Sequence, residues 1–302
     1  MYDIIIIGGG AAGMTAALYT LRAGKTVLLI EKDAIGGQIA LSPRVENFPS
    51  IKEIAGNEFS DKLFDQILSL GAEFELDNVL EIRKENDIFN VVGDFATYQS
   101  KAIILATGVK HRHIGIDHEE ELIGKGVSYC AVCDGPFFKD EEVCLIGDGN
   151  TSLQYAILLS NYCKKIYLCT LFDKFFGDAA LVKKIKEREN IEIIHNVSLK
   201  EFKYDDQLTG LLFEHTLDKK PMELNVKGCF IAIGQIPENK QFENLVELDK
   251  NGYFVVDENL ASKTPGVFVA GDCRAKKIRQ LTTAVADGAI ASVGAVAYID
   301  KL

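Results

Sequence analysis

The stretch that decides the fold is residues 3–31, DIIIIGGGAAGMTAALYTLRAGKTVLLIE. The apolar run DIIII predicts a buried strand, and TVLLIE at the end of the stretch predicts another. Between them, small and apolar residues recur at helical spacing as far as Gly24, a residue type that commonly ends helices. Strand, glycine turn, helix and strand in this order are typical of a βαβ unit.

The glycine turn of this unit, GGGAAG (8–13), fits the pattern G-x-G-x-x-G between a strand and a helix. Gly8 permits a tight turn, Gly10 lets a pyrophosphate approach the backbone, and Gly13 permits close packing of the helix on the strand. The first N–H groups of the helix are free to bind phosphate. Glu31 ends the second strand, where an acid can bind ribose hydroxyls. The sequence therefore predicts a dinucleotide site at this turn.

The same order of elements recurs at 141–170, EEVCLIGDGNTSLQYAILLSNYCKKIYLCT. Its glycine turn is a second, degenerate candidate nucleotide site, comprising Gly147, Gly149, Asn150, Thr151 and Ser152. Because β-rich segments follow each unit, we expect an α/β fold of two Rossmann-like, three-layer ββα domains, the second inserted into the first. Residues 1–115 plus 246–302 are expected to form one domain and residues 116–245 the other.

Composition narrows the classes of partner. The chain has 302 residues and a formal net charge of −11, which disfavours nucleic acid and anionic membranes as partners. The apolar N-terminus is short and lacks the basic start of a signal peptide, and no apolar run was expected to span a bilayer. These features predict a cytoplasmic protein that binds neither nucleic acid nor membrane.

Two of the seven cysteines, Cys130 and Cys133, form a C-x-x-C motif, whereas the other five lie singly in apolar or strand-like runs. A four-ligand zinc site usually needs a second close pair, and the histidines show no ligand spacing, so no metal is expected. The motif instead predicts a redox dithiol, in which one thiolate attacks a partner disulfide and the other resolves the mixed intermediate. The adjacent Asp134 could exchange a proton with the thiols, or could cap the turn that follows.

Six segments occur in the order in which low-molecular-weight thioredoxin reductases carry them, and the chain resembles that family over its whole length. They are GGQ (36–38), ENFP (46–49), ATG (106–108), CAVCDG (130–135), GVFVAGDC (266–273) and RQ (279–280). The resemblance implies FAD in the first domain, electron transfer from FAD through Cys130 and Cys133 to thioredoxin, and a homodimer. It also implies that Asp134 protonates the dithiol and that one domain rotates against the other.

The resemblance assigns the residues that would bind FAD. They are Gly8, Gly10, Ala11, Ala12, Gly13, Glu31, Gly37, Gln38, Asn47, Thr107, Gly108, Asp272, Arg279, Gln280 and Leu281. Among these, Asp272 follows an apolar strand and could accept hydrogen bonds from the ribityl hydroxyls, or could cap a loop.

The second nucleotide site departs from the family pattern. In the register that places Glu31 after the first glycine turn, the corresponding position after the second holds Thr170. Family members that use NADPH carry a segment close to H-R-R-x-x-x-R, whose arginines bind the 2′-phosphate. In this chain those arginines fall at Leu171, Phe172 and Phe176, which cannot neutralise a phosphate.

The electron donor is therefore left open. NADPH could bind through other cations (Lys164, Lys165 or Lys174), NADH would need no phosphate grip, or a ferredoxin or another reductant could reduce FAD directly. The basic segment RAKKIR (274–279) could dock an acidic carrier such as ferredoxin. Two alternatives to a thioredoxin reductase also remain, a reductase of another disulfide and a flavin-bound redox sensor.

Overall fold

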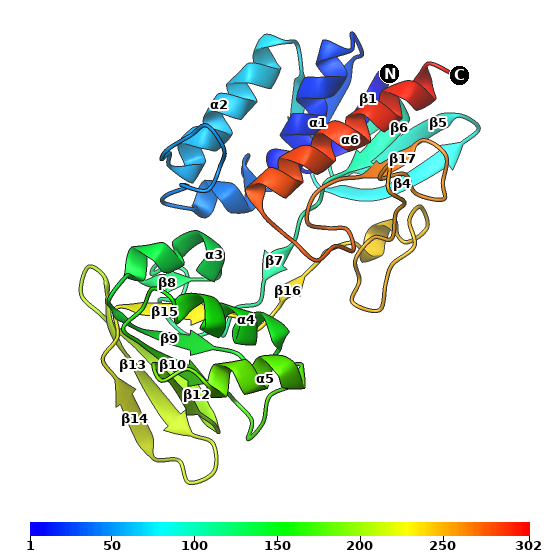
Figure 1. The fold of residues 1–302 in the computed structure, drawn as a ribbon. Coiled ribbons are helices and arrows are strands. Elements are labelled where there is room, and N and C mark those ends of the chain that lie inside the picture. The colour runs from blue at the N-terminus through cyan, green and yellow to red at the C-terminus, as the bar shows by residue number, and fades with distance from the viewer. The chain divides into compact units, whose positions relative to one another are not determined.

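The computed structural model describes residues 1–302, and the chain divides into two compact units (Figure 1). Unit 1 comprises residues 1–110 and 236–302, and unit 2 comprises residues 111–235. The chain enters and leaves unit 2 through two short paired strands, β7 (Lys110–His111) and β16 (Gln235–Ile236). Unit 2 is thus inserted into the sequence of unit 1.

The predicted domain boundaries, 115/116 and 245/246, lie further along the chain than these. At the first boundary, Ile114 packs against the core of unit 2, together with Ile116. At the second, Phe242 in the short helix η3 (Lys240–Phe242) is fully buried in the core of unit 1. Both differences arise from apolar side chains whose packing partners are distant in sequence.

Unit 1 is built on a seven-stranded sheet in which β1 pairs in parallel with β2 and β6, and β6 pairs in parallel with β17. A β4–β5 hairpin extends the sheet by antiparallel pairing of β5 with β6. The strands are β1 (Tyr2–Ile7), β2 (Val27–Glu31), β3 (Glu73–Leu76), β4 (Val79–Glu85), β5 (Ile88–Gly93), β6 (Thr97–Leu105) and β17 (Val267–Val269).

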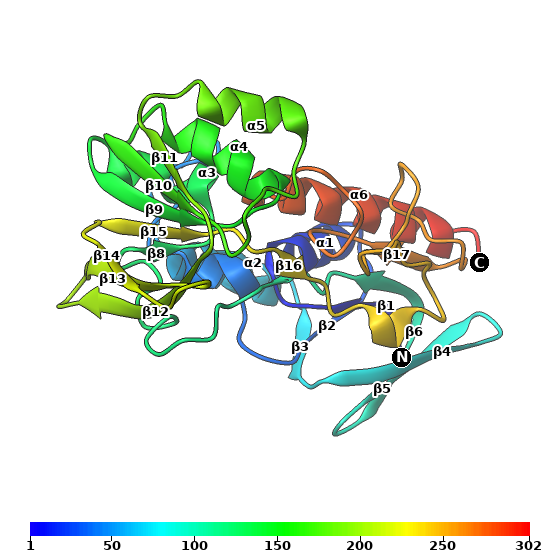
Figure 2. The same ribbon diagram turned by 90° about the horizontal axis from the view of Figure 1, so that it is seen from below.

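Two apolar cores cover the two faces of β1. Ile4 and Ile6 pack in one core with residues of α1 (Ala11–Arg22), α2 (Gly56–Ser69) and α6 (Leu281–Ile299). Ile5 and Ile7 pack in the other core, with the hairpin and the segment around Phe242. Figure 2 shows the hairpin on the side of the sheet away from α6. Burial on both faces explains why the strand is a continuous apolar run rather than an alternating one.

Helix α6 is long and apolar enough, by length and composition alone, to cross a membrane. Its window has a mean hydropathy of 1.4, so the expectation that no apolar run approaches membrane-spanning length is wrong for this segment. In the structure α6 packs along α1, where the Thr20 and Ser292 hydroxyls lie 2.8 Å apart. A Cβ on Gly288 would lie 2.2 Å from the carbonyl oxygen of Ala12, which shows how closely the two helices approach. One face of α6 thus packs on α1, and 33% of its apolar window is buried.

Unit 2 repeats the plan with a five-stranded parallel sheet in the order β11-β10-β9-β15-β8 and a separate antiparallel sheet of β12, β13 and β14. The parallel strands are β8 (Val127–Ser128), β9 (Glu142–Ile146), β10 (Lys165–Cys169), β11 (Ile191–Ile194) and β15 (Gly228–Ile231). The antiparallel strands are β12 (Val197–Tyr204), β13 (Leu208–His215) and β14 (Pro221–Leu224). The helices are α3 (Ala131–Asp134), η2 (Gly135–Phe138), α4 (Asn150–Leu159) and α5 (Ala179–Lys186). The predicted α/β fold of two Rossmann-like domains, one inserted into the other, is confirmed.

Candidate functional site

The first glycine turn is closed to side chains at two positions and open at a third. A Cβ on Gly8 would lie 2.3 Å from the carbonyl oxygen of Ala106, and one on Gly13 would lie 1.9 Å from that of Gly8. Gly8 also has a φ of 110°, which disfavours any other residue. A Cβ on Gly10 would meet only the Gly36 carbonyl oxygen, at 3.9 Å. The backbone at Gly10 is therefore accessible to a ligand beside the N-terminus of α1.

Glu31, at the end of β2, is held at the edge of this turn by backbone N–H groups. Its Oε2 accepts a hydrogen bond from Gly9 at 2.6 Å, and its Oε1 accepts from Lys32 at 2.8 Å and from Asp33 at 2.9 Å. Three donors fix the carboxylate in one orientation where the sequence predicted a ribose-binding acid. The geometry fits that role.

The segment that carries Gly37 and Gln38 lies beside the same turn. These two residues begin the short helix η1 (Gly37–Leu41), and the preceding Gly36 donates its N–H to the Gly9 carbonyl oxygen at 2.9 Å. Ala11, in the first turn of α1, shares an apolar cluster with Leu281, the first residue of α6. The structure therefore brings three separate predicted segments of unit 1 to the glycine turn or to the start of α1.

Other predicted residues of unit 1 are joined by side-chain hydrogen bonds. The Asn47 amide donates to Gln280 Oε1 at 3.2 Å, and Gln280 forms a capping box at the start of α6. The Thr107 hydroxyl donates to Asn239 Oδ1 at 2.9 Å, and the neighbouring Gly108 has a φ of 66°. Thr107 is thus held by a residue that the sequence analysis did not single out.

Asp272 follows β17 and carries a buried oxygen, Oδ1, that lacks a hydrogen-bond partner in the chain. Burial raises the pKa of this carboxyl, while the cations Lys276 and Arg279 oppose the rise. The Lys276 ammonium lies 3.3 Å from Oδ1, close enough for charge attraction. The ion pair with Lys276 does not form a well-directed hydrogen bond, so this buried oxygen can still accept one from a hydroxyl supplied by a ligand. With the open Gly10 backbone and the oriented Glu31, it makes unit 1 suited to FAD.

Arg279 lies against the same loop. Its guanidinium donates to the Asp272 carbonyl oxygen at 3.1 Å and to the Arg274 carbonyl oxygen at 3.2 Å. The guanidinium carbon also lies 4.1 Å from the ring centroid of Tyr253. These contacts fix the loop that carries Asp272.

The basic segment RAKKIR has two of its cations, Arg274 and Lys276, paired internally, whereas Lys277 is exposed. Arg274 makes two hydrogen bonds to Asp287, at 2.8 and 2.9 Å, and the Lys276 ammonium lies 2.9 Å from the same carboxylate. The side chain of Lys276 is only 7% exposed and that of Asp287 only 6%. The expectation that this segment docks an acidic carrier is therefore wrong for Arg274 and Lys276, because Asp287 of α6 already neutralises them. Asp287, missed by the sequence reasoning, is the sole charged residue of that apolar helix.

The predicted redox pair lies at the start of α3 in unit 2. Cys130 and Cys133 form a disulfide, and the Cys133 N–H points to Cys130 Sγ at 3.1 Å. Both cysteines are partly buried, whereas Val132 between them is 45% exposed. The pair is thus set in a partly desolvated place, with an apolar side chain on the surface beside it.

Asp134 ends α3 and is mostly enclosed. Its Oδ2 accepts a hydrogen bond from the Ser128 hydroxyl at 2.6 Å, and its Oδ1 is buried without a partner. Burial raises the pKa of this carboxyl, and the bond from Ser128 opposes the rise. Asp134 makes no side-chain bond to the first turn of η2, so the alternative role as a cap is not formed. A carboxyl with a raised pKa beside a dithiol can exchange a proton with it.

The second glycine turn is formed but differs from the first. A Cβ on Gly147 would lie 2.5 Å from the Ala232 carbonyl oxygen, and a Cβ on Gly149 would have open space. Ser152, in the third glycine place, is fully buried and donates to the Gly149 carbonyl oxygen at 2.8 Å. Asn150 accepts a hydrogen bond from the Asp178 N–H at 2.7 Å, and Thr151 follows it in the first turn of α4.

In unit 2, the side chain at the position expected to bind ribose is already hydrogen-bonded within the chain. Thr170 is 1% exposed, its hydroxyl lies 2.7 Å from the Phe172 carbonyl oxygen, and it also lies 2.7 Å from His195 Nδ1. A single hydroxyl proton and two local partners leave little for a ligand. Thr170 therefore does not replace the carboxylate that Glu31 presents in unit 1.

The three positions expected to hold arginines expose apolar surface. Leu171 is 50% exposed, Phe172 47% and Phe176 58%. The rings of Phe172 and Phe176 meet edge to face with centroids 5.2 Å apart, and the Lys174 ammonium lies 5.4 Å from the Phe176 centroid. This surface has no geometry for a phosphate.

Two of the lysines considered as substitutes are already paired. The Lys164 ammonium lies 2.8 Å from a Glu142 carboxylate oxygen, and that of Lys165 lies 2.6 Å from one of Glu192. Only Lys174 of the three adjoins the aromatic pair.

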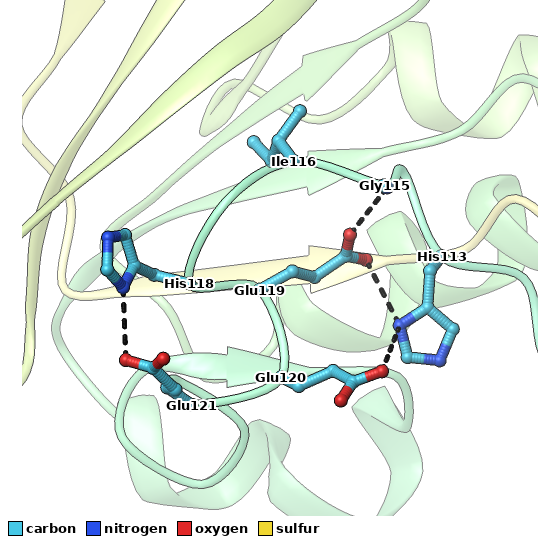
Figure 3. A pocket seen from close by; sticks show the side chains of 7 residues that line it. All are labelled: His113, Gly115, Ile116, His118, Glu119, Glu120 and Glu121. Carbon is cyan, nitrogen blue, oxygen red and sulfur yellow. Dashed lines mark hydrogen bonds and ion pairs between the residues drawn. The ribbon is translucent and has the colours of Figure 1, made fainter.

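A pocket in unit 2, shown in Figure 3, is lined by residues that the predictions did not include: His113, Gly115, Ile116, His118, Glu119, Glu120 and Glu121. The buried Glu119 already accepts hydrogen bonds from Ile114 and Gly115 N–H groups and from the Tyr129 hydroxyl. The pocket is therefore lined by a loop that hydrogen bonds hold beside Tyr129, and the buried Glu119 carboxylate already accepts hydrogen bonds within the chain. No group of three histidine, cysteine or acidic side chains in the structure is arranged to hold a metal ion.

Comparisons with known proteins match the whole chain. Residues 2–288 match the family model described as pyridine nucleotide-disulphide oxidoreductase. A thioredoxin reductase of Listeria monocytogenes is 40% identical over 100% of this chain and 95% of its own length, and one of Bacillus subtilis is 36% identical over 100% and 96%. A protein described as a 34.2 kDa protein in the rubredoxin operon of Clostridium pasteurianum is 35% identical over 98% and 97%. The solved thioredoxin reductase of Streptococcus pyogenes superimposes with a TM-score of 0.97 at 34% identity, covering 100% of this chain and 99% of that one.

Proposed function

Since the chain belongs to the pyridine nucleotide-disulphide oxidoreductases, and among them to the low-molecular-weight thioredoxin reductases, we propose that it carries electrons from bound FAD through Cys130 and Cys133 to a thioredoxin-type disulfide. The observation that carries this proposal is the Cys130–Cys133 disulfide with the enclosed Asp134 carboxyl directly after it. Its donor, in our proposal, is a ferredoxin-type protein or another reductant rather than NADPH.

Unit 1 would hold FAD. The Gly10 backbone and the N-terminus of α1 would receive the pyrophosphate, Glu31 would bind ribose, and Asp272 would accept from a ribityl hydroxyl. Around these, the proposed site is completed by residues from the same unit: Gly8, Ala11, Ala12, Gly13, Gly37, Gln38, Asn47, Thr107, Gly108, Arg279, Gln280 and Leu281. When bound, FAD supplies the two electrons that open a disulfide.

Unit 2 would perform the exchange with the partner. In the reduced pair, one thiol gives up its proton and its sulfur attacks the partner disulfide, which expels one partner sulfur. The second cysteine then attacks the mixed disulfide, so the partner leaves as a dithiol and the Cys130–Cys133 bond forms again. Asp134 is the proposed group that takes and returns a proton during these steps.

The exposed side chain of Val132 supports contact with a protein partner at this place. Val132 is 45% exposed between the two cysteines, so the surface beside the disulfide can be reached by a protein partner. We propose a thioredoxin or a thioredoxin-like protein as that partner. A homodimer in the cytoplasm is part of the same proposal, on the family resemblance.

Three observations support a donor other than NADPH. Thr170 is buried and internally bonded where a ribose acceptor would stand. Leu171, Phe172 and Phe176 present apolar surface where a phosphate would need cations. The name of one relative, the rubredoxin operon protein, associates it with a small electron carrier. NADH remains the second candidate, because the open backbone at Gly149 could still receive a pyrophosphate.

The test of the dithiol function bypasses the donor. FAD-loaded protein is reduced with dithionite without oxygen, freed of excess reductant and mixed with oxidised thioredoxin, and the appearance of thioredoxin thiols is followed. We expect about two thiols for every two electrons stored, and so about four per chain when both FAD and the Cys130–Cys133 pair are reduced. A Cys133→Ser variant should fail to release product, whereas Cys163→Ser, at a buried cysteine of the same unit, should behave as the unaltered protein. A reduced protein that stays reduced beside thioredoxin would instead indicate a sensor or another disulfide substrate.

A further inference from the structure

We infer that Ser128 is a positioning residue for the dithiol chemistry: it holds the Asp134 carboxylate so that Oδ1 is the oxygen that receives the exchanged proton. This role rests on the proposed exchange at Cys130 and Cys133. It concerns the direction of the hydrogen bonds that join the end of β8 to both ends of α3.

In the carboxylate form of Asp134, the hydrogen bonds around Ser128 have one direction. The Cys130 backbone N–H donates to Ser128 Oγ at 3.0 Å, because a backbone N–H cannot accept. The single hydroxyl proton of Ser128 is then directed to Asp134 Oδ2, which lies 2.6 Å away. Cys130 N–H, Ser128 and Asp134 therefore form a chain of donors that ends at Oδ2.

This direction decides which carboxylate oxygen is free to receive a proton. Because Oδ2 of the carboxylate already accepts the Ser128 proton, Oδ1 is the oxygen left to receive a proton from a thiol. Oδ1 is buried and lacks any hydrogen-bond partner in the chain, so no other donor of the protein competes for it. It belongs to the residue directly after Cys133. The geometry thus leaves Oδ1 as the oxygen that gives and takes a proton.

Few charged or titratable groups surround the carboxyl. Tyr155 faces it from α4. Burial is the larger cause of the raised pKa of the Tyr155 phenol, and the charge of Asp134 adds to the rise. The Cys130–Cys133 pair adjoins it on α3 itself, and Tyr162 lies close to Gly135 at the start of η2. Burial raises the pKa of Asp134, and the Ser128 hydrogen bond is the contact that lowers it. Ser128 therefore opposes the effect of burial on the pKa of Asp134 and favours the carboxylate form.

In the exchange this arrangement has a defined proton balance. A thiol of the reduced pair transfers its proton to Oδ1 of the Asp134 carboxylate, which leaves a thiolate and a neutral carboxyl. The thiolate forms a bond to the partner disulfide while one partner sulfur leaves with the electron pair. The proton on Oδ1 then passes to the expelled partner sulfur, and the restored carboxylate can accept the proton of the second thiol. Two protons and two electrons leave the pair in all.

The test is the pH profile of the exchange in Ser128→Ala and Ser128→Thr. The protein is reduced with dithionite as above, so no physiological donor is needed. Loss of the donated hydrogen bond raises the pKa of Asp134 further, so less carboxylate is available at acid pH. We expect Ser128→Ala to displace the acid limb of the profile to higher pH. At pH values below the acid limb, the exchange rate of Ser128→Ala should be about tenfold lower than that of the unaltered protein, and at higher pH the two rates should be nearly equal. A tenfold change is the size expected when a charged group loses one hydrogen bond.

Two further variants separate positioning from a structural role. Ser128→Thr keeps the hydroxyl and should restore the profile, while Ser100→Ala, at a fully buried serine of β6, should leave it unchanged. In an Asp134→Asn background, Ser128→Ala should no longer displace the profile. A uniform fall at every pH, an unmoved acid limb, or an equal displacement in the Asp134→Asn background would overturn the inference.

The outcome also remains readable if thioredoxin is not the partner. The same profile is then taken with a small aromatic disulfide, which reports the exchange without a protein partner. An inert thioredoxin with a displaced profile on the small disulfide would reject the proposed substrate and support the role of Ser128. An active thioredoxin with an undisplaced profile would do the reverse.

Discussion

The ion pairs around Asp287 give a stability prediction that bears on the flavin site. Replacing Asp287 by Asn removes one negative charge and keeps the shape of the side chain. The carboxylate accepts hydrogen bonds from Arg274, Lys276 and the Gly271 N–H, and an amide oxygen can retain only part of that set. The same loop continues to Asp272, so the change also disturbs the group proposed to bind the ribityl chain.

The magnitude follows from burial. The side chains of Lys276 and Asp287 are 7% and 6% exposed, and Arg274 is 23% exposed. Removing one partner of a buried ion pair leaves an uncompensated charge and typically costs about 3–5 kcal/mol. Although burial raises the pKa of Asp287, its bonds to Arg274 and Lys276 lower it overall. The charge therefore stabilises the fold above the unfolded pKa of about 4, and this contribution is lost as pH falls through the lower folded value.

The assay is urea unfolding of FAD-loaded protein followed by far-UV circular dichroism, since the chain has no tryptophan to report fluorescence. We expect Asp287→Asn to lower the unfolding free energy by about 3–5 kcal/mol at pH 7 and by less at pH values below about 4. Asp300→Asn, at the exposed end of α6, is the matched control and should change little. A loss at pH 7 no larger than that of the control would refute the argument from burial.

Two further predictions concern the nucleotide sites. Gly13→Ala should abolish flavin retention, because its Cβ would lie 1.9 Å from the Gly8 carbonyl oxygen, whereas Gly149→Ala has open space and should keep its flavin. The ratio of flavin to protein absorbance measures both, and a flavin-loaded Gly13→Ala protein would contradict the assigned cradle. Replacing Leu171 and Phe172 together with Arg should tighten NADPH binding about tenfold relative to NADH, as expected for charge-assisted contacts at a partly exposed site. Calorimetric titration with each nucleotide tests this, and an equal gain for both would show that the 2′-phosphate is not what the arginines contact.

The first glycine turn could be predicted from sequence because its determinants are local. Steric demands at Gly8 and Gly13 involve the strand and helix on either side, and Glu31 follows at a fixed spacing. The same register counted from the second turn located Thr170 correctly. It did not reveal that the Thr170 hydroxyl would pair with His195, which comes from the end of the next strand in the sheet.

The basic segment at 274–279 shows where the sequence reading failed. A run of cations usually lies in solvent, so Lys276 was interpreted as part of a docking surface. Its partner, Asp287, lies 11 residues later in α6, and the Asp287 carboxylate contacts the loop that carries Lys276. Only the packing of α6 against the rest of unit 1 decides that this acid is buried. The domain boundary before Phe242 was missed for the same reason, since the core contacts of that ring are set by tertiary structure.

Part of the redox site could be predicted from the sequence. Spacing singled out Cys130, Cys133 and the adjoining Asp134. Ser128 was not noticed, because a serine two residues before a cysteine has no meaning until the end of β8 places its hydroxyl between a backbone N–H and a carboxylate. A polar residue buried beside an active pair is the signal that could have found it, and burial is a property of the fold.

The choice of electron donor is the central claim, and anaerobic addition of pyridine nucleotide to oxidised, FAD-loaded protein tests it most directly. The flavin absorbance band is followed after micromolar NADPH or NADH, with dithionite added last to show that the flavin can be reduced. The account predicts that neither nucleotide bleaches the band and that the dithionite-reduced protein then forms thiols on thioredoxin. Rapid bleaching by NADPH at micromolar concentration would contradict it, and would mean that a phosphate is bound despite Leu171, Phe172 and Phe176.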